Sequence, residues 1–131
     1  MTPGVGFVVF LFITLGFLGS VVVTGLKAQR KRHIRLVVGA VLSLGITIYY
    51  AERLGESYDI ESAGIITPIH LTLAKVTVVA YLLPVITGWR TIKNPANRSL
   101  HGKIAYTVLA LTVLTAVTGV LMILLADRLP A

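Results

Sequence analysis

Four long apolar runs alternate with shorter polar segments along the chain. The runs cover residues 5–26, 34–51, 69–89 and 103–126. Each is close to the roughly 20 helical residues that cross a bilayer core about 30 Å thick. A spanning segment of this kind must be helical, because the hydrocarbon core offers no water to its backbone groups. The pattern therefore predicts four membrane-spanning helices.

The lengths of the polar segments predict how these helices connect. The segments cover residues 27–33, 52–68 and 90–102. Short connections make successive helices antiparallel neighbours. We therefore predict an all-α, integral membrane four-helix bundle of up-down-up-down topology, with residues 1–131 forming a single transmembrane domain. Pro84 lies within the third run and predicts a kink there.

Charge is distributed unevenly between the two ends of the predicted bundle. The first and third polar segments, with the residues that flank them, are basic: Lys27, Arg30, Lys31, Arg32, Arg35, Arg90, Lys93, Arg98 and Lys103. The opposite end is acidic: Glu52, Glu56, Asp59, Glu61 and Asp127. Lys and Arg concentrate in short cytoplasmic loops, so we expect an inner-membrane protein, of bacterial type, with both termini outside the cytoplasm. The net charge of +7 is then an orientation signal that also favours anionic lipid, and nucleic acid is not an expected partner.

Composition excludes several classes of chemistry. The chain has no cysteine, which excludes disulfides, iron–sulfur ligation and thiolate catalysis. No acidic residue lies inside an apolar run and no Ser/His/Asp grouping stands out, so hydrolytic catalysis is not indicated. The connections are too short for a soluble domain. Whether the protein is an enzyme stays open at this stage.

The three histidines each stand at the start of an apolar run. His33 and His101 open the second and fourth runs at the basic end, and His70 opens the third run at the other end. In an up-down bundle these second and fourth helices occupy opposite corners. With neighbouring axes 8–10 Å apart, the diagonal is about 11–14 Å. The wide end of that range approximates what two imidazoles and an iron between them need, so we predict one bis-histidine haem b per chain.

Glycines recur at matching positions in the runs. Thr87-Gly88 follows His70 at the offset at which Thr118-Gly119 follows His101. Because neighbouring helices are antiparallel, each histidine is expected beside a glycine of the adjacent helix. We also predict that Gly39 and Gly88 leave room for a flat porphyrin. The alternative is that the histidines are ordinary interfacial residues and the glycines serve close helix packing.

Two stretches resemble a known family. Residues 27–46, "KAQRKRHIRLVVGAVLSLGI", and 97–120, "NRSLHGKIAYTVLALTVLTAVTGV", are similar to helices of cytochrome b561-type proteins. The resemblance implies that His33 and His101 are axial ligands of b-type haem. That family uses two such sites in six helices, whereas this chain has four predicted spans and three histidines. A second haem is therefore not implied here. The chain also resembles an uncharacterised four-helix group linked to assembly of haem–copper oxidases.

A second candidate site lies at the acidic end. His70, Lys75, Tyr50 and Glu52 are all expected at this level, and Lys75 is the only charge well inside a run. Histidine titrates near neutrality, so the cluster is a candidate quinone or proton-exchange site. The alternatives are a contact surface for a larger complex, a lysine that reaches to the interface, and tyrosines of the aromatic belt.

These observations favour a membrane b-type haem protein that carries electrons between the quinone pool and a partner. It would work with other membrane subunits of a larger complex or as a homo-oligomer, in contact with the lipid bilayer. The alternative function is a non-catalytic structural or assembly subunit of a respiratory or photosynthetic membrane complex. One histidine can also ligate a chlorophyll-type pigment, so the identity of the pigment stays open.

Overall fold

The computed structural model describes residues 1–130. Its long helices are α1 (Pro3–Leu26), α2 (Arg30–Gly55), α3 (Ile66–Ala80), α4 (Leu82–Lys93) and α5 (Arg98–Leu125). The short elements are β1 (Tyr58–Asp59), η1 (Ile60–Ala63), η2 (Pro95–Asn97) and β2 (Asp127–Arg128). β1 and β2 pair as a two-stranded sheet. Four helical segments are long and apolar enough to cross a membrane: Pro3–Leu26, Arg30–Gly55, Ile66–Lys93 and Pro95–Leu125. The predicted all-α class and the four predicted spans are therefore confirmed.

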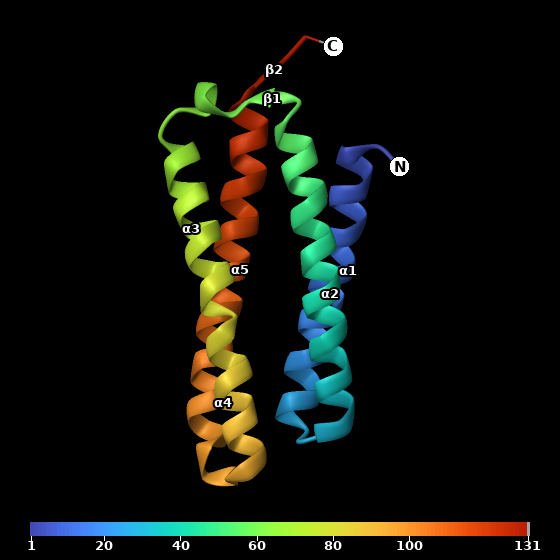
Figure 1. Ribbon diagram of the computed structural model, residues 1–131, viewed down its shortest axis with the longest axis vertical. Coiled ribbons are helices and arrows are strands. Elements are labelled where there is room, and N and C mark those ends of the chain that lie inside the picture. Colours follow the sequence, from blue (N-terminus) through green and yellow to red (C-terminus); the bar gives the residue numbers. More distant parts are fainter. Residues whose placement is uncertain (131) are drawn as a thin grey trace. The chain divides into compact units, whose positions relative to one another are not determined.

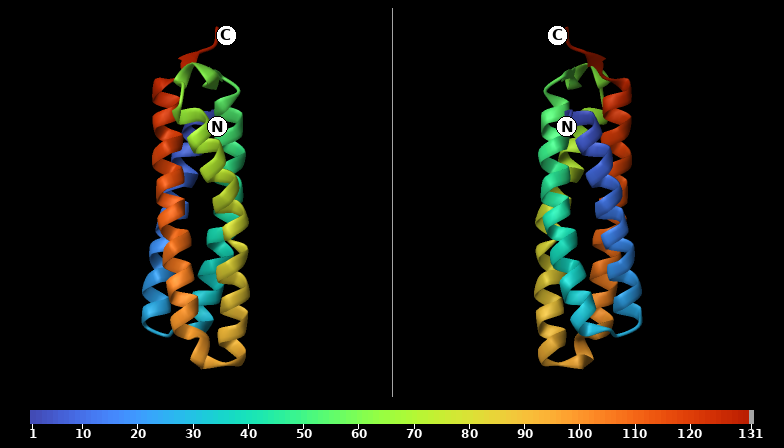
Figure 2. Two further views of the ribbon diagram at one scale, coloured as in Figure 1. Left: turned by 90° about the vertical axis from the view of Figure 1, so that its left-hand side faces the viewer. Right: turned by 90° about the vertical axis from the view of Figure 1, so that its right-hand side faces the viewer.

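The chain divides into two compact units, each built around a pair of antiparallel helical arms. The N-terminal hairpin (Met1–Tyr58) contains α1 and α2, and the C-terminal hairpin (Asp59–Ala131) contains α3, α4 and α5. Figure 1 shows α1 running against α2, and α3 with α4 running against α5. The two views of Figure 2 agree that the arms lie side by side within each hairpin. In each hairpin we call the end with the α1–α2 or α4–α5 connection its basic end, after the Lys and Arg residues there.

Local signals in the sequence fix both ends of α1. The Thr2 hydroxyl accepts a hydrogen bond from the Val5 N–H at 3.4 Å, and Pro3 occupies the first turn, where its missing N–H costs nothing. At the far end, the Gln29 N–H donates to the Thr24 carbonyl at 2.9 Å and the Ala28 N–H donates to the Gly25 carbonyl at 3.1 Å. This pair of bonds is a Schellman motif. It reverses the chain into α2 within three residues.

Ala28 stands at the left-handed position of this motif, with φ at 53°. The left-handed conformation costs a residue with a Cβ about 1–2 kcal/mol. Glycine avoids this steric cost but loses more conformational freedom on folding, which costs about 0.5–1 kcal/mol. We therefore expect Ala28→Gly to stabilise the N-terminal hairpin by about 0.5–1 kcal/mol. Thermal unfolding in detergent measures this. Lys27→Gly, one residue earlier at φ −79°, is the matched control and should destabilise.

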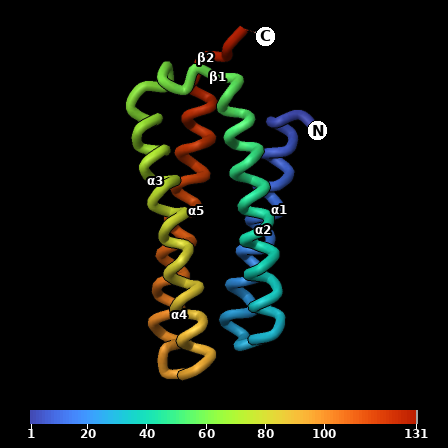
Figure 3. The backbone as a smooth tube through the Cα atoms, viewed as in Figure 1, coloured from blue at the N-terminus to red at the C-terminus, as the bar shows by residue number. Residues whose placement is uncertain are grey.

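The third span is interrupted where Pro84 was expected to kink it. α3 ends at Ala80 and α4 begins at Leu82. Pro84 has no N–H to donate to the Ala80 carbonyl, and its ring clashes with that carbonyl, so the helical ladder breaks there. The Tyr81 hydroxyl bonds the Thr112 hydroxyl of α5 at 2.8 Å and holds the break against the opposite arm. Figure 3 traces the chain from α3 into α4 with no loop between them, so the two helices form one span.

Small hydroxyl side chains, rather than large apolar ones, fill the interior of both hairpins. In residues 1–130 the buried polar residues are Thr14, Thr24, Ser43, Thr47, Thr67, Thr77, Thr87 and Thr112, and the buried apolar ones are Ala40, Val108 and Met122. Large apolar side chains such as Phe12, Val79 and Leu124 are exposed. This is the pattern of a membrane protein, in which lipid solvates apolar side chains and small residues let helices approach.

The interior hydroxyls are all satisfied. Within the part of the chain that the structure describes, no buried side-chain nitrogen or oxygen lacks a hydrogen-bond partner. Most of the threonines donate to the carbonyl four residues earlier in their own helix, as Thr47 does to Ser43 at 2.8 Å. Each hydroxyl oxygen then still has lone pairs with which to accept a bond from the facing helix.

Candidate functional site

His101 bonds a threonine of the antiparallel arm. It lies in the first turns of α5, and its Nδ1 is 3.1 Å from the Thr87 hydroxyl of α4. That hydroxyl donates its own hydrogen to the Leu83 carbonyl at 2.8 Å. With its hydrogen used there, the hydroxyl accepts from His101, which assigns the imidazole hydrogen to Nδ1.

His33 makes the equivalent contact in the N-terminal hairpin. It lies in the first turns of α2, and its Nδ1 is 3.0 Å from the Val21 carbonyl and 3.4 Å from the Thr24 hydroxyl of α1. A carbonyl can only accept, so Nδ1 of His33 is again the protonated nitrogen. The Thr24 hydroxyl donates to the Ser20 carbonyl at 2.8 Å.

His70 repeats the arrangement at the opposite end of the C-terminal hairpin. Its Nδ1 is 3.1 Å from the Thr118 hydroxyl of α5, which donates to the Leu114 carbonyl at 2.9 Å. Nδ1 therefore donates here too. In its neutral form, each of the three imidazoles is therefore assigned the tautomer with its hydrogen on Nδ1 and its lone pair on Nε2, which is the tautomer of a histidine that binds metal through Nε2.

The glycine that follows each of these threonines makes room for the imidazole. A methyl group added at Gly88 would lie 3.3 Å from Cε1 of His101, and one at Gly25 would lie 3.3 Å from Cε1 of His33. At Gly119 the distance to Cε1 of His70 would be only 2.7 Å. The prediction that each histidine lies beside a glycine of the adjacent antiparallel helix is confirmed.

The structure gives Gly39 and Gly88 neighbours that the sequence did not suggest. Gly88 faces the His101 ring, and a methyl group at Gly39 would lie 2.6 Å from Cε1 of Phe17. Both small residues thus make room for a ring of their own hairpin. The predicted contact of these glycines with a porphyrin stays a prediction.

Bonds between hydroxyls tie the middle of each hairpin together. The Thr14 and Thr47 hydroxyls are 2.9 Å apart in the N-terminal hairpin, and the Thr77 and Thr115 hydroxyls are 2.9 Å apart in the C-terminal one. The first hairpin adds a bond from Thr14 to the Ser43 hydroxyl at 3.1 Å. Such pairs satisfy both hydroxyls in a region without water.

These contacts reveal an internal repeat. Thr14, Thr24 and Gly25 recur 63 residues later as Thr77, Thr87 and Gly88, and Arg30, His33 and Thr47 recur 68 residues later as Arg98, His101 and Thr115. The repeat joins a mid-hairpin threonine pair to a histidine–threonine–glycine contact at the basic end. His70 has no counterpart, because residue 7 is phenylalanine. Sequence reasoning found a shorter repeat, from one histidine-bearing helix to the next. The longer repeat, from one hairpin to the next, rests on threonine bonds between two helices. Those bonds can be identified only once the helices are paired in the structure.

The residues of the second candidate site lie in both hairpins. In the N-terminal hairpin, the Tyr50 ring packs on Gly6 and stacks on Phe10, with centroids 5.7 Å apart and planes at 13°. Glu52 is exposed. In the C-terminal hairpin, His70 is half-buried against α5 and the Lys75 side chain is exposed. The gathering of these four side chains at one site stays a prediction.

Comparison of the chain with models of protein families, with curated proteins and with solved structures finds no match. The resemblance to cytochrome b561-type proteins therefore rests on residues 27–46 and 97–120 alone. Within residues 1–130, no three histidine, cysteine or acidic side chains gather as they would to hold a bare metal ion. A haem needs fewer protein ligands, because its macrocycle supplies four and two histidines complete the coordination.

Proposed function

We propose that the protein is a membrane b-type haem protein that carries electrons between the quinone pool and a partner, as a subunit of a larger complex. The observation that carries the proposal is the contact that Nδ1 of His33 and Nδ1 of His101 each make with an oxygen of the facing arm. In each, Nδ1–H donates to an oxygen of the facing arm, at 3.0 and 3.1 Å, so Nε2 holds the lone pair. Metal-bound histidines use this arrangement, since the second hydrogen bond orients the ring and raises the basicity of the ligand.

In this proposal His33 and His101 hold the iron through their Nε2 atoms, and Thr24 and Thr87 orient the rings. A bis-histidine haem supplies reversible one-electron transfer. The two ligands stand at equivalent positions of the repeat, which suits a pair of like axial ligands. The placement of the two hairpins that brings both Nε2 atoms to one iron is itself part of the proposal.

His70 is the residue proposed to meet quinol. Its Nδ1–H is bound to Thr118, so Nε2 is the nitrogen that would accept a proton from a quinol hydroxyl. Lys75, Tyr50 and Glu52 are proposed to complete that site. A quinol gives up protons with its electrons, so a base at the site lowers the cost of oxidation.

A specific observation favours a second candidate, a structural or assembly subunit without electron transfer. Each imidazole fills the space above a glycine and bonds the neighbouring threonine, and such a contact also serves helix packing alone. The histidines would then act only to hold the arms of each hairpin together.

Absorption spectroscopy of the purified protein separates the two candidates. Protein from haem-replete cells should be red, with the reduced α-band of a bis-imidazole b haem and one haem per chain. A colourless preparation that is folded and stable would contradict the haem proposal and support the structural subunit. A pigment with a chlorophyll spectrum would replace haem in the proposal.

A further inference from the structure

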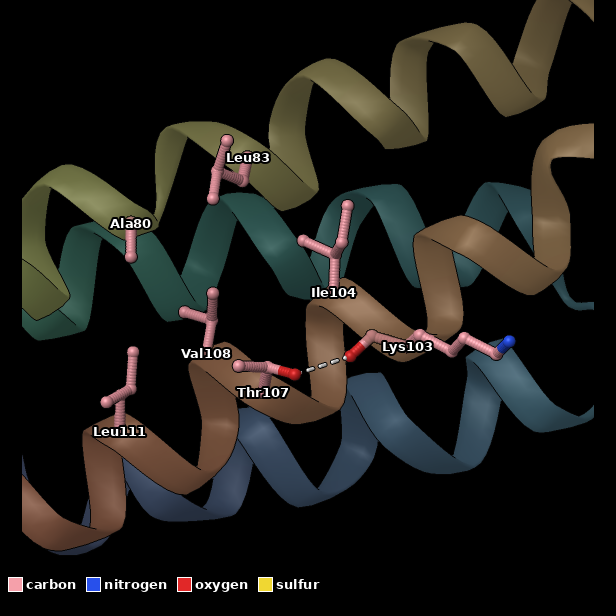
Figure 4. A pocket seen from close by; sticks show the side chains of 7 residues that line it. All are labelled: Ala80, Leu83, Lys103, Ile104, Thr107, Val108 and Leu111. Carbon is pink, nitrogen blue, oxygen red and sulfur yellow. Dashed lines mark hydrogen bonds between the residues drawn. The ribbon is translucent and has the colours of Figure 1, made fainter.

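A hollow lies beside the break in the third span. It has a volume of about 180 Å³ and is lined by one face of α5 and by residues at the α3–α4 junction: Ala80, Leu83, Lys103, Ile104, Thr107, Val108 and Leu111. Pro84 breaks the ladder at the Ala80 carbonyl, and the small Ala80 side chain leaves the space beneath the break unfilled. Figure 4 shows the apolar side chains of both arms directed toward this space.

The lining has the chemistry of a hydrocarbon site with one cation at its edge. Ala80, Leu83, Ile104, Val108 and Leu111 present only carbon. The Thr107 hydroxyl donates to the Lys103 carbonyl at 2.9 Å, so its hydrogen is used within its own helix. The hollow therefore suits a segment of hydrocarbon chain.

Lys103 places a positive charge at one end of the hollow, which sets the orientation of a bound ligand. Its extended side chain points away from the apolar residues, as Figure 4 shows, and Lys103 itself lies in the second turn of α5, near the α4–α5 connection. The neighbouring basic-end residues Arg90 and Arg98 add to the positive charge, and the sequence has no acidic residue between Glu61 and Asp127. From Lys103 to Leu111 the helix rises about 12 Å. A molecule that fills this site carries an anion at the basic end and a hydrocarbon tail toward the middle of the span.

We infer that the hollow binds one acyl chain of an anionic phospholipid whose phosphate pairs with Lys103. The chain lies against Ala80, Ile104 and Leu111, and the headgroup stays at the interface, where the lysine ammonium reaches it. A single cation near the membrane surface contributes about 1 kcal/mol to the binding of anionic lipid, which corresponds to a roughly fivefold preference over a zwitterionic one. The bound chain also covers the break in the third span.

Native mass spectrometry of the detergent-purified full chain tests this with phosphatidylglycerol and phosphatidylcholine. The protein should retain one phosphatidylglycerol with a roughly fivefold preference. Lys103→Gln should bring the two lipids to within about twofold of each other. Ala80→Leu, which fills the hollow, should reduce the retention of both lipids.

Lys93→Gln is the matched control. Lys93 is also a basic-end lysine, but its ammonium lies over the Trp89 ring at 5.4 Å and it does not line the hollow. This variant should keep the preference for phosphatidylglycerol. A preference that survives Lys103→Gln overturns the inference, as does an equal loss in Lys93→Gln, which would show a diffuse basic surface. Lys103→Gln changes charge with little change in volume, so it decides the question even if Ala80→Leu fails to fold.

Discussion

His33→Ala and His101→Ala should each abolish the low-spin spectrum of the proposed haem. Loss of either proposed axial ligand would break six-coordination, and the remaining histidine alone would give a high-spin or haem-free product. The measurement is the reduced-minus-oxidised absorption spectrum, with haem quantified per chain. Helix content from circular dichroism should stay close to that of the parent protein, because each substitution removes one side chain near the end of a long helix.

His70→Ala is the control that the sequence itself offers. His70 makes the same kind of contact, with Thr118 and Gly119, as His101 makes with Thr87 and Gly88. Its removal should therefore cost similar packing energy but leave the spectrum intact, while slowing reduction by quinol. Haem lost from His70→Ala and retained in His101→Ala would overturn the assignment of the ligands. It would place the cofactor at the acidic end with a different partner.

Gly119→Ala should destabilise the C-terminal hairpin by up to about 2 kcal/mol, although alanine is the better helix former. The added methyl would lie 2.7 Å from Cε1 of His70. Either the imidazole or the α5 backbone must then move, and overpacking of this kind costs about 1–3 kcal/mol. Unfolding in detergent, followed by circular dichroism, gives the change in free energy.

Two further variants identify the cause of that loss. A methyl at Gly16 meets no atom within 4 Å, so Gly16→Ala should gain up to about 1 kcal/mol from helix propensity alone. In a His70→Ala background, Gly119→Ala should lose its penalty, since the clashing ring is absent. Equal stability of Gly119→Ala and Gly16→Ala would show that the imidazole does not occupy the space above Gly119.

The histidine contacts are compatible with both a structural role and the proposed ligand role. In each imidazole, Nδ1 holds the facing arm through threonine or carbonyl oxygen, as His33 does with Val21 at 3.0 Å. A metal would use the other nitrogen. A histidine that packs a hairpin is therefore also a histidine whose ring orientation and tautomer are set before any cofactor arrives.

Much of the fold was predictable because hydrophobicity alone decides which segments enter a membrane. The four apolar runs, the kink at Pro84 and the positions of His33, His70 and His101 near helix starts all follow from the order of residue types. The pairing of histidines with glycines was also predictable, since antiparallel arms bring the start of one helix beside the end of the other. The ligand set at His33 and His101 stays a prediction, because the sequence shows which residues share a depth and not which nitrogens meet.

The sequence by itself determined that there are four apolar spans and which ends of these spans are basic. It also determined that each histidine lies beside a glycine of the adjacent helix. These properties depend on composition along one helix and on length against the thickness of the bilayer. Only the tertiary structure decided which threonine holds each Nδ1, that Gly88 and Gly39 face rings of their own hairpins, and that the hairpins repeat each other at Thr14–Thr47 and Thr77–Thr115. The reason is physical: a hydroxyl looks the same in sequence whether it bonds its own helix or the next one. The choice is made when two helices pack closely enough for a bond about 3 Å long to join them.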